Sequence, residues 1–215
     1  MKQILCYGDS NTYGYIPENG ERYAYGVRWT SLLSERLKPY GITVAEEGVC
    51  GRTTQYEDAT RPGRNGLATL SSVLAKHPEA DAAILMLGTN DCKTLYQATA
   101  EEIGAGIAHL LDQLKAQNRF DTILLLSPIH LGEHVYEADY DPEFSDWSVP
   151  LSKALESVYE RIARQYGVSF LKASDYASPS SVDQEHLSVE GHRALADGIF
   201  CTLCNINEVR ECAAS

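Results

Sequence analysis

Short apolar runs alternate with segments of helical spacing along this chain, and that alternation most constrains its fold. Five runs are expected to form strands: 4–7, 42–45, 82–87, 123–126 and 168–171. Each run is largely apolar instead of apolar at every second residue, which is typical of strands buried on both faces. Because helical segments separate the runs, we expect a three-layer α/β/α fold around a flavodoxin-like, five-stranded parallel sheet.

Apolar residues three or four positions apart mark the expected helices: 29–37, 67–77, 99–114, 151–166 and 189–203. Thr99 and Glu102 match a capping box at the start of the third helix, and Ser188 is the expected N-cap of the last. Residues 11–26 are rich in Gly, Pro and Tyr and are expected to form a long loop. Residues 128–150 exceed an ordinary connection and are a candidate lid loop.

Length and composition favour one globular domain over residues 1–215, with a tail at 205–215. Apolar residues make up 44% of the 215 and charged residues 22%, so the chain can bury a full core. Lys and Arg number 18 against 30 Asp and Glu, which gives a formal net charge of −12 at pH 7. Such a surface repels nucleic-acid phosphates and anionic lipid, so we expect neither nucleic acid nor a membrane as a partner.

Targeting patterns and cysteine usage predict a cytoplasmic protein. The longest aliphatic run, 82–87, is far shorter than the roughly 20 residues that cross a bilayer. No signal-peptide pattern follows Met1. Six cysteines lack the spacing of a disulfide framework, so we expect reduced thiols.

Polar and glycine-containing segments follow four of the expected strands, where parallel sheets bind ligands. GDS at 8–10, GTND at 88–91 and DQEH at 183–186 resemble three sequence blocks of the SGNH (GDSL-type) hydrolase superfamily. The resemblance spans residue 4 to about residue 200. A narrower likeness to the mycobacterial arylesterase and acyltransferase branch rests on RWT at 28–30, EEG at 46–48, RTT at 52–54 and MLGTND at 86–91.

One departure from the superfamily concerns its second block. Many members carry Asn one or two residues before the first glycine of that block, where this chain has Glu46 and Glu47. Gly51 still matches the glycine that the superfamily uses. We therefore expect the oxyanion role to be kept and the surrounding pocket to differ.

Three residues have the chemistry of nucleophilic ester hydrolysis. Ser10 is the expected nucleophile, and His186 is the expected general base because the ordinary pKa of imidazole lies near 6.5. Asp183 is close enough to hold the imidazole N–H and fix its tautomer. The resemblance implies an oxyanion hole made by the backbone N–H groups of Ser10 and Gly51 and the side-chain amide of Asn90.

These residues predict a serine esterase that hydrolyses small, acetyl-like esters through an acyl-enzyme on Ser10. No cofactor and no metal are expected. The branch resemblance implies acyl transfer to alcohols as a second activity, and a homo-oligomer. Side chains near the motifs are the expected substrate contacts: Asp9, Asn11, Tyr13, Thr89 and Lys93.

Other functions are open at this point. The same fold serves carbohydrate acetyl esterases, lysophospholipases and thioesterases. A non-enzyme alternative is a flavodoxin-like module that binds phosphate or flavin after the first strand. There a helix should begin at once with its N-terminus at the phosphate, whereas a long loop is expected here.

Several residues have a second interpretation. His192 is a rival base, although its helical position favours packing. His130 and His134, with Glu133, could imitate a metal site. Cys50 and Cys92 neighbour the expected oxyanion donors and are interpreted as pocket-wall residues. Tyrosines of the 11–26 loop fit a surface loop, an aromatic rim for substrate, or a subunit interface equally well.

Overall fold

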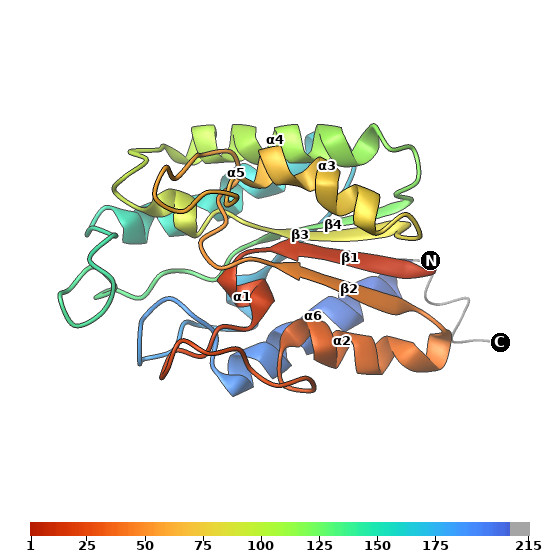
Figure 1. Cartoon of the computed structure of the whole chain (residues 1–215), viewed down its shortest axis with the longest axis horizontal. Helices are drawn as coiled ribbons and strands as arrows, with labels where there is room; N and C mark the ends of the chain where they lie inside the picture. The colour runs from red at the N-terminus through yellow and green to blue at the C-terminus, as the bar shows by residue number, and fades with distance from the viewer. Residues whose placement is uncertain (207–215) are drawn as a thin grey trace.

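A parallel sheet forms the centre of the molecule (Figure 1). The computed structural model describes residues 1–206, and within them five strands lie in the order β2-β1-β3-β4-β5. All neighbouring pairs of these strands are parallel, as predicted. The strands are β1 Gln3–Gly8, β2 Thr43–Gly48, β3 Ala82–Met86, β4 Thr122–Ser127 and β5 Ser169–Lys172.

Helices cover both faces of the sheet, which gives the predicted three layers (Figure 1). One face carries α3 Gly66–Lys76, α4 Ala100–Lys115 and α5 Ser148–Tyr166. The other carries α2 Trp29–Leu37 and α6 Val189–Asn205. Short helical turns complete the described part: α1 Ser10–Tyr13, η1 Lys38–Tyr40, η2 Asn90–Cys92 and η3 Ala173–Asp175.

Each face of the sheet has its own apolar core. In β1, Leu5 and Tyr7 face the core under α3, α4 and α5, whereas Ile4 and Cys6 face the core under α2 and α6. All four side chains are at most 2% exposed. Because successive side chains of a strand point to opposite faces, a strand covered on both sides needs consecutive apolar residues.

Two helix starts agree with the predicted caps. The Thr99 side chain accepts a hydrogen bond from the backbone N–H of Glu102, whose carboxylate accepts one from the backbone N–H of Thr99. The hydroxyl of Ser188 accepts from the N–H of Gly191 at the start of α6. These hydrogen bonds satisfy backbone donors that have no partner inside a helix.

The predicted long loop at 11–26 is wrong in its first residues, because α1 begins at Ser10, separated from the end of β1 at Gly8 only by the Asp9 cap. Asp9 caps this single turn, and its carboxylate accepts from the N–H of Asn11 at 3.0 Å. The candidate lid also ends earlier than predicted, since α5 begins at Ser148. Of the expected tail at 205–215, residues 207–215 lie outside the described part.

No helix within residues 1–206 combines the length and the apolar character that crossing a bilayer requires.

Candidate active site

The chain changes direction across the sheet between β1 and β3. These strands are neighbours, but α2 follows β1 on one face and α4 follows β3 on the other. Ser10 stands directly after β1, and Asn90 begins η2 shortly after β3. Such a switch point in strand order opens a crevice at the carboxyl ends of the strands, so both residues lie where ligands of this architecture bind.

Ser10, His186 and Asp183 form a continuous hydrogen-bond chain. The Oγ of Ser10 lies 2.8 Å from Nε2 of His186, and Nδ1 of the same ring lies 2.6 Å from Oδ2 of Asp183. The other carboxylate oxygen of Asp183 accepts from the backbone N–H groups of Glu185 and His186, each at 3.0 Å. The carboxylate therefore holds both the ring and the turn that carries it.

Asn11 connects this turn to the end of β1. Its side-chain oxygen accepts from the N–H of Leu187 at 2.9 Å, and its amide donates to the carbonyl oxygen of Glu185 at 3.3 Å. These residues flank His186 on both sides, so one buried amide sets the position of the imidazole relative to Ser10. Asn11 is 2% exposed. Its contacts favour a positioning role instead of the predicted substrate contact.

The segment after β2 is bound to the ends of β1 and β3. Arg52 donates from Nη1 to the carbonyl oxygen of Gly8 at 2.8 Å, and its guanidinium lies 4.1 Å from the ring centroid of Tyr7. Asp91 accepts from the N–H and the hydroxyl of Thr54, at 2.9 and 2.5 Å. These contacts fix Gly51 relative to the other two segments of the site.

Three N–H donors of the site lack a full set of protein acceptors. Asn90 donates one hydrogen of its amide to the carbonyl oxygen of Arg52 at 3.2 Å, and an amide carries a second. Within residues 1–206, the backbone N–H groups of Ser10 and Gly51 donate to no protein group. The φ of Gly51 is +79°, a conformation that favours glycine. The donors come from three different segments that line one cavity, and preorganised N–H donors are what stabilise an oxyanion.

A cavity of about 220 Å³ opens above Ser10. Its wall is polar and charged, with few apolar side chains. The lining residues are Ser10, Tyr15, Cys50, Gly51, Arg61, Arg64, Asn90, Lys93, Asp141, Glu143, Glu185 and His186.

Of the five predicted substrate contacts, only Lys93 lines this cavity. Asp9 and Thr89 are at most 2% exposed and, like Asn11, lie outside the lining. Tyr13 packs under the guanidinium of Arg22, 4.7 Å from its ring centroid. The structure thus places four of the five away from the cavity wall.

An aromatic rim is one interpretation of the tyrosines at 11–26, and one of them, Tyr15, lines the cavity with its ring centroid 4.3 Å from that of His186. Other lining residues are not among the predicted contacts. Glu185 lies inside the DQEH block, where only the first and last residues were singled out. Arg61 and Arg64 follow β2, so their place after a strand end was the one available indication.

Charges around His186 determine its protonation. Burial by itself lowers the pKa of His186, but the nearby Glu185 carboxylate and the hydrogen bond that the ring donates to Asp183 raise the pKa above its ordinary 6.5. Burial opposes ionisation of Asp183, yet hydrogen bonds from His186 hold its pKa below 3.8. The ring therefore binds a proton more readily than a free imidazole, while Asp183 stays ionised.

Two further carboxyl groups near the site are shifted the other way. Burial raises the pKa of Asp9 to about 7 and that of Asp91 to about 6. Asp9 caps α1 next to the serine, and its Oδ2 is buried without a hydrogen-bond partner among residues 1–206. A charge at Asp9 favours the protonated form of His186.

The Glu46–Glu47 departure affects the support of β2 instead of the cavity wall. Glu46 accepts from Nε and Nη2 of Arg28, both at 2.9 Å, and from the Thr30 hydroxyl at 2.6 Å. Glu47 lies 2.7 Å from Nε2 of His77. Neither carboxylate lines the cavity, and the expected difference from the pocket of other members stays a prediction.

His192 is not placed as a base for Ser10, and His130, His134 and Glu133 do not form a metal-like cluster. His192 is fully buried, and its Nδ1 accepts from the N–H of Trp29 at 3.2 Å. His130 pairs with Glu156, while His134 and Glu133 form ion pairs elsewhere. Within residues 1–206, no three His, Cys, Asp or Glu side chains are grouped to hold a metal ion.

The two cysteines near the site are protonated at neutral pH. Burial raises the pKa of Cys50 to about 11 and that of Cys92 well above its ordinary value. Cys50 lines the cavity beside Ser10, whereas Cys92 is 2% exposed and lines a neighbouring one. A thiolate is the reactive form, so neither has the character of a nucleophile.

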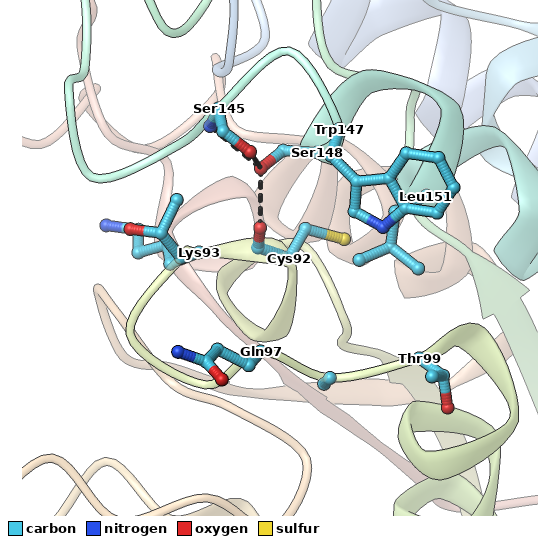
Figure 2. A pocket seen from close by; sticks show the side chains of 10 residues that line it. Cys92, Lys93, Gln97, Thr99, Ser145, Trp147, Ser148 and Leu151 are labelled. Carbon is cyan, nitrogen blue, oxygen red and sulfur yellow. Dashed lines mark hydrogen bonds between the residues drawn. The ribbon is translucent and has the colours of Figure 1, made fainter.

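That neighbouring cavity is larger, about 370 Å³, and more apolar (Figure 2). Figure 2 shows Trp147 and Leu151 on one side and Lys93 on the other, and the Ser148 hydroxyl donates a hydrogen bond to the Cys92 carbonyl oxygen. Of the Ser10–His186–Asp183 chain, no member lines it. Size alone therefore does not identify the reactive cavity.

Residues 6–194 match the model of the GDSL-like Lipase/Acylhydrolase family. The chain belongs to this family. It is similar to a carbohydrate acetylesterase family member from Sinorhizobium meliloti, with 31% identity, a TM-score of 0.85 and coverage of 96% of this chain and 99% of that one. It is also similar to the aryl esterase of M. smegmatis, with 32% identity, a TM-score of 0.84 and coverage of 95% and 99%. A comparison with curated proteins found no match.

As a member of the GDSL-like family, the chain is a carboxylic ester hydrolase with the SGNH hydrolase fold. The recognition made from the sequence is confirmed. The flavodoxin-like binding module is wrong as a function, although the order of the five strands is flavodoxin-like.

Proposed function

We propose that this enzyme hydrolyses small esters with short, acetyl-like acyl groups through an acyl-enzyme on Ser10. The observation that carries the proposal is the chain of hydrogen bonds at 2.8 and 2.6 Å from Ser10 through His186 to Asp183. A serine hydroxyl becomes a useful nucleophile when a base lies within about 2.6–3.2 Å. Ser10 and His186 line a small cavity that a short acyl group can fill.

Ser10, His186 and Asp183 have different roles in the reaction. His186 removes the proton from Ser10 through Nε2 as Oγ bonds to the carbonyl carbon, and then protonates the leaving alkoxide. Water repeats the cycle on the acyl-enzyme and releases the acid. Asp183 keeps the proton of the neutral ring on Nδ1 and stabilises the imidazolium.

The negative charge on the carbonyl oxygen is stabilised by three N–H donors. These are the backbone N–H groups of Ser10 and Gly51 and the amide hydrogen of Asn90 that Arg52 leaves unused. All three residues line the same cavity. A single donor of this kind contributes about 2.7–4 kcal/mol to the transition state.

A carbohydrate acetyl esterase is the second candidate, because a specific observation favours it. The cavity wall is rich in charged and polar side chains, which suits hydroxyl groups better than a long alkyl chain. The Sinorhizobium meliloti relative is likewise described as a carbohydrate acetylesterase family member. Lysophospholipase and thioesterase activities are less favoured, since this wall offers little apolar surface.

A fluorophosphonate probe tests the nucleophile. Intact-mass and peptide mapping should place one adduct on Ser10, and Ser10→Ala should abolish labelling. Exposed Ser157→Ala is the matched control. An adduct on another residue overturns the assignment. A panel of 4-nitrophenyl esters from two to twelve carbons, together with acetylated sugars, then measures the acyl length and the alcohol that the site accepts.

Acyl transfer to alcohols, a cytoplasmic location, a mobile lid at 128–150 and a homo-oligomer stay predictions. Adding a primary alcohol to the esterase assay measures transfer as new ester, and light scattering measures the mass in solution. In the structure, Asp141 and Glu143 of the candidate lid line the cavity, so movement of this segment would change the wall itself.

A further inference from the structure

Two of the three cations that line the cavity are already neutralised. Arg61 binds Asp58 at 2.5 Å and Glu143 at 2.8 Å. Lys93 binds Glu143 at 2.5 Å and lies 3.4 Å from Asp141. Each cation thus has two carboxylate neighbours, and neither has its charge free for a ligand.

Arg64 is different. Within residues 1–206, its guanidinium forms no hydrogen bond and no ion pair, yet it lines the cavity beside Ser10. Its main chain is fixed, because the carbonyl oxygen of Arg64 accepts from the N–H of Thr53 at 2.9 Å. Arg64 is half-buried, so it combines a firm backbone with a charged head that lines the cavity.

The guanidinium lies against the glycine of the oxyanion hole. A Cβ built on Gly51 would be 2.8 Å from Nη1 and 3.1 Å from Cζ of Arg64. A group bound to Arg64 is therefore close to a carbonyl held by Gly51, Ser10 and Asn90. Both groups can therefore belong to one small molecule.

We propose that the preferred ester carries a free carboxylate near its scissile carbonyl, and that Arg64 binds this carboxylate. The proposal rests on the proposed esterase function of Ser10. A planar guanidinium matches a carboxylate through two parallel hydrogen bonds. Other carboxylates of the wall, such as Glu185, repel a doubly charged phosphate more strongly than a singly charged carboxylate.

Pairs of esters that differ only in charge test the preference. Monomethyl succinate and methyl succinamate place a carboxylate or a neutral amide on the acyl side. For the alcohol side, the pair is 4-acetoxybenzoate and 4-acetoxybenzamide. Titration of released acid gives kcat/KM for each ester. In one of the two pairs we expect the wild-type enzyme to favour the carboxylate, and the pair concerned identifies the side that Arg64 faces.

Variants assign the preference to Arg64. Arg64→Gln should lower the ratio of carboxylate to amide kcat/KM at least about tenfold, mainly through KM. Arg64→Lys should keep part of the preference, because an ammonium keeps the charge without the planar fork. Exposed Arg164→Gln removes the same charge far from the cavity and should leave the ratio unchanged. Equal ratios in wild type and Arg64→Gln overturn the proposal.

A binding measurement separates this proposal from the esterase function. NMR titration of Ser10→Ala with monomethyl succinate and methyl succinamate needs no turnover, and the acetoxybenzoate pair is titrated in the same way. Tighter binding of a carboxylate, lost in Ser10→Ala/Arg64→Gln, supports the role of Arg64 even if Ser10 escapes the fluorophosphonate probe. Indistinguishable affinities within both pairs reject that role even if Ser10 is labelled.

Discussion

His186 and His192 stand six residues apart and are both buried, at 7% and 0% exposure. Their surroundings nevertheless shift their pKa values in opposite directions. The pKa of His186 is raised, whereas burial and the nearby Arg28 charge lower that of His192 to about 3. His192 accepts a hydrogen bond from the backbone N–H of Trp29, and the ring of Tyr23 packs against it in a T-shaped arrangement. His186 is hydrogen-bonded to the carboxylate of Asp183 and lies near the charge of Glu185.

The comparison separates the effect of burial from the effect of charge. Loss of water disfavours the imidazolium at both positions, so burial alone cannot produce a base that works near neutral pH. Neighbouring carboxylates reverse the shift at His186 and are lacking in the contacts described for His192. The first histidine can therefore exchange protons during turnover, while the second serves as a neutral hydrogen-bond acceptor that caps the start of α2.

Removing the carboxylate that orients His186 should have the largest effect. Asp183→Asn should lower kcat about 10⁴-fold with the fold intact, as loss of the correct tautomer does in serine proteases. Asp175→Asn, an exposed change on η3, is the control. Near-normal kcat in Asp183→Asn would transfer the orienting role to Glu185, whose Oε2 lies 3.8 Å from Nδ1 of the ring.

A substitution at Asn90 tests whether the cavity beside His186 also stabilises the oxyanion. Asn90→Ala should reduce kcat by about 10²–10³ with little change in KM, because the donor fits the tetrahedral oxyanion better than the ground state. Steady-state kinetics on 4-nitrophenyl acetate measure both constants, with exposed Gln117→Ala as control. A raised KM with unchanged kcat would place Asn90 in substrate binding instead.

The low pKa of His192 predicts a loss of stability in acid. The unfolded chain binds a proton near pH 6.5 and the folded chain only near pH 3, so the contribution to stability falls as pH drops through this window. Between pH 7 and pH 5 the wild type should lose about 2 kcal/mol more than His192→Asn, measured by urea unfolding. Exposed His134→Asn is the control. Equal pH slopes for wild type and His192→Asn would refute this explanation.

Glu185 should have the smallest effect, a shift in the pH profile. Its negative charge raises the pKa of His186, so Glu185→Gln should move the acid limb of kcat/KM to lower pH by up to about one unit. The direction follows because the His186 ring without this charge loses its proton at lower pH, so it can act as a base from a lower pH upward. Glu160→Gln, a partly exposed position on α5, should leave the profile in place. An acid limb that moves to higher pH would contradict the assignment.

Local patterns predicted most of the architecture. The apolar runs gave all five strands to within a few residues, and Thr99 and Ser188 marked two helix starts as expected. The difference at α1 has a local cause. Asp9 caps a turn that is too short to show helical periodicity, so the sequence predicts a loop from residue 11 onward.

The amino-acid sequence by itself determined the parallel α/β fold and the three motifs, because hydrophobic periodicity and short blocks are local properties of a chain. It also placed Ser10, Asp183 and His186 at predicted strand ends or after them. Only the tertiary structure decided what surrounds them. Asn11 meets residues 185 and 187 across more than 170 positions, and Arg64 reaches Gly51 by folding of the segment after β2. Such contacts depend on side-chain direction in three dimensions, which no spacing along the chain encodes.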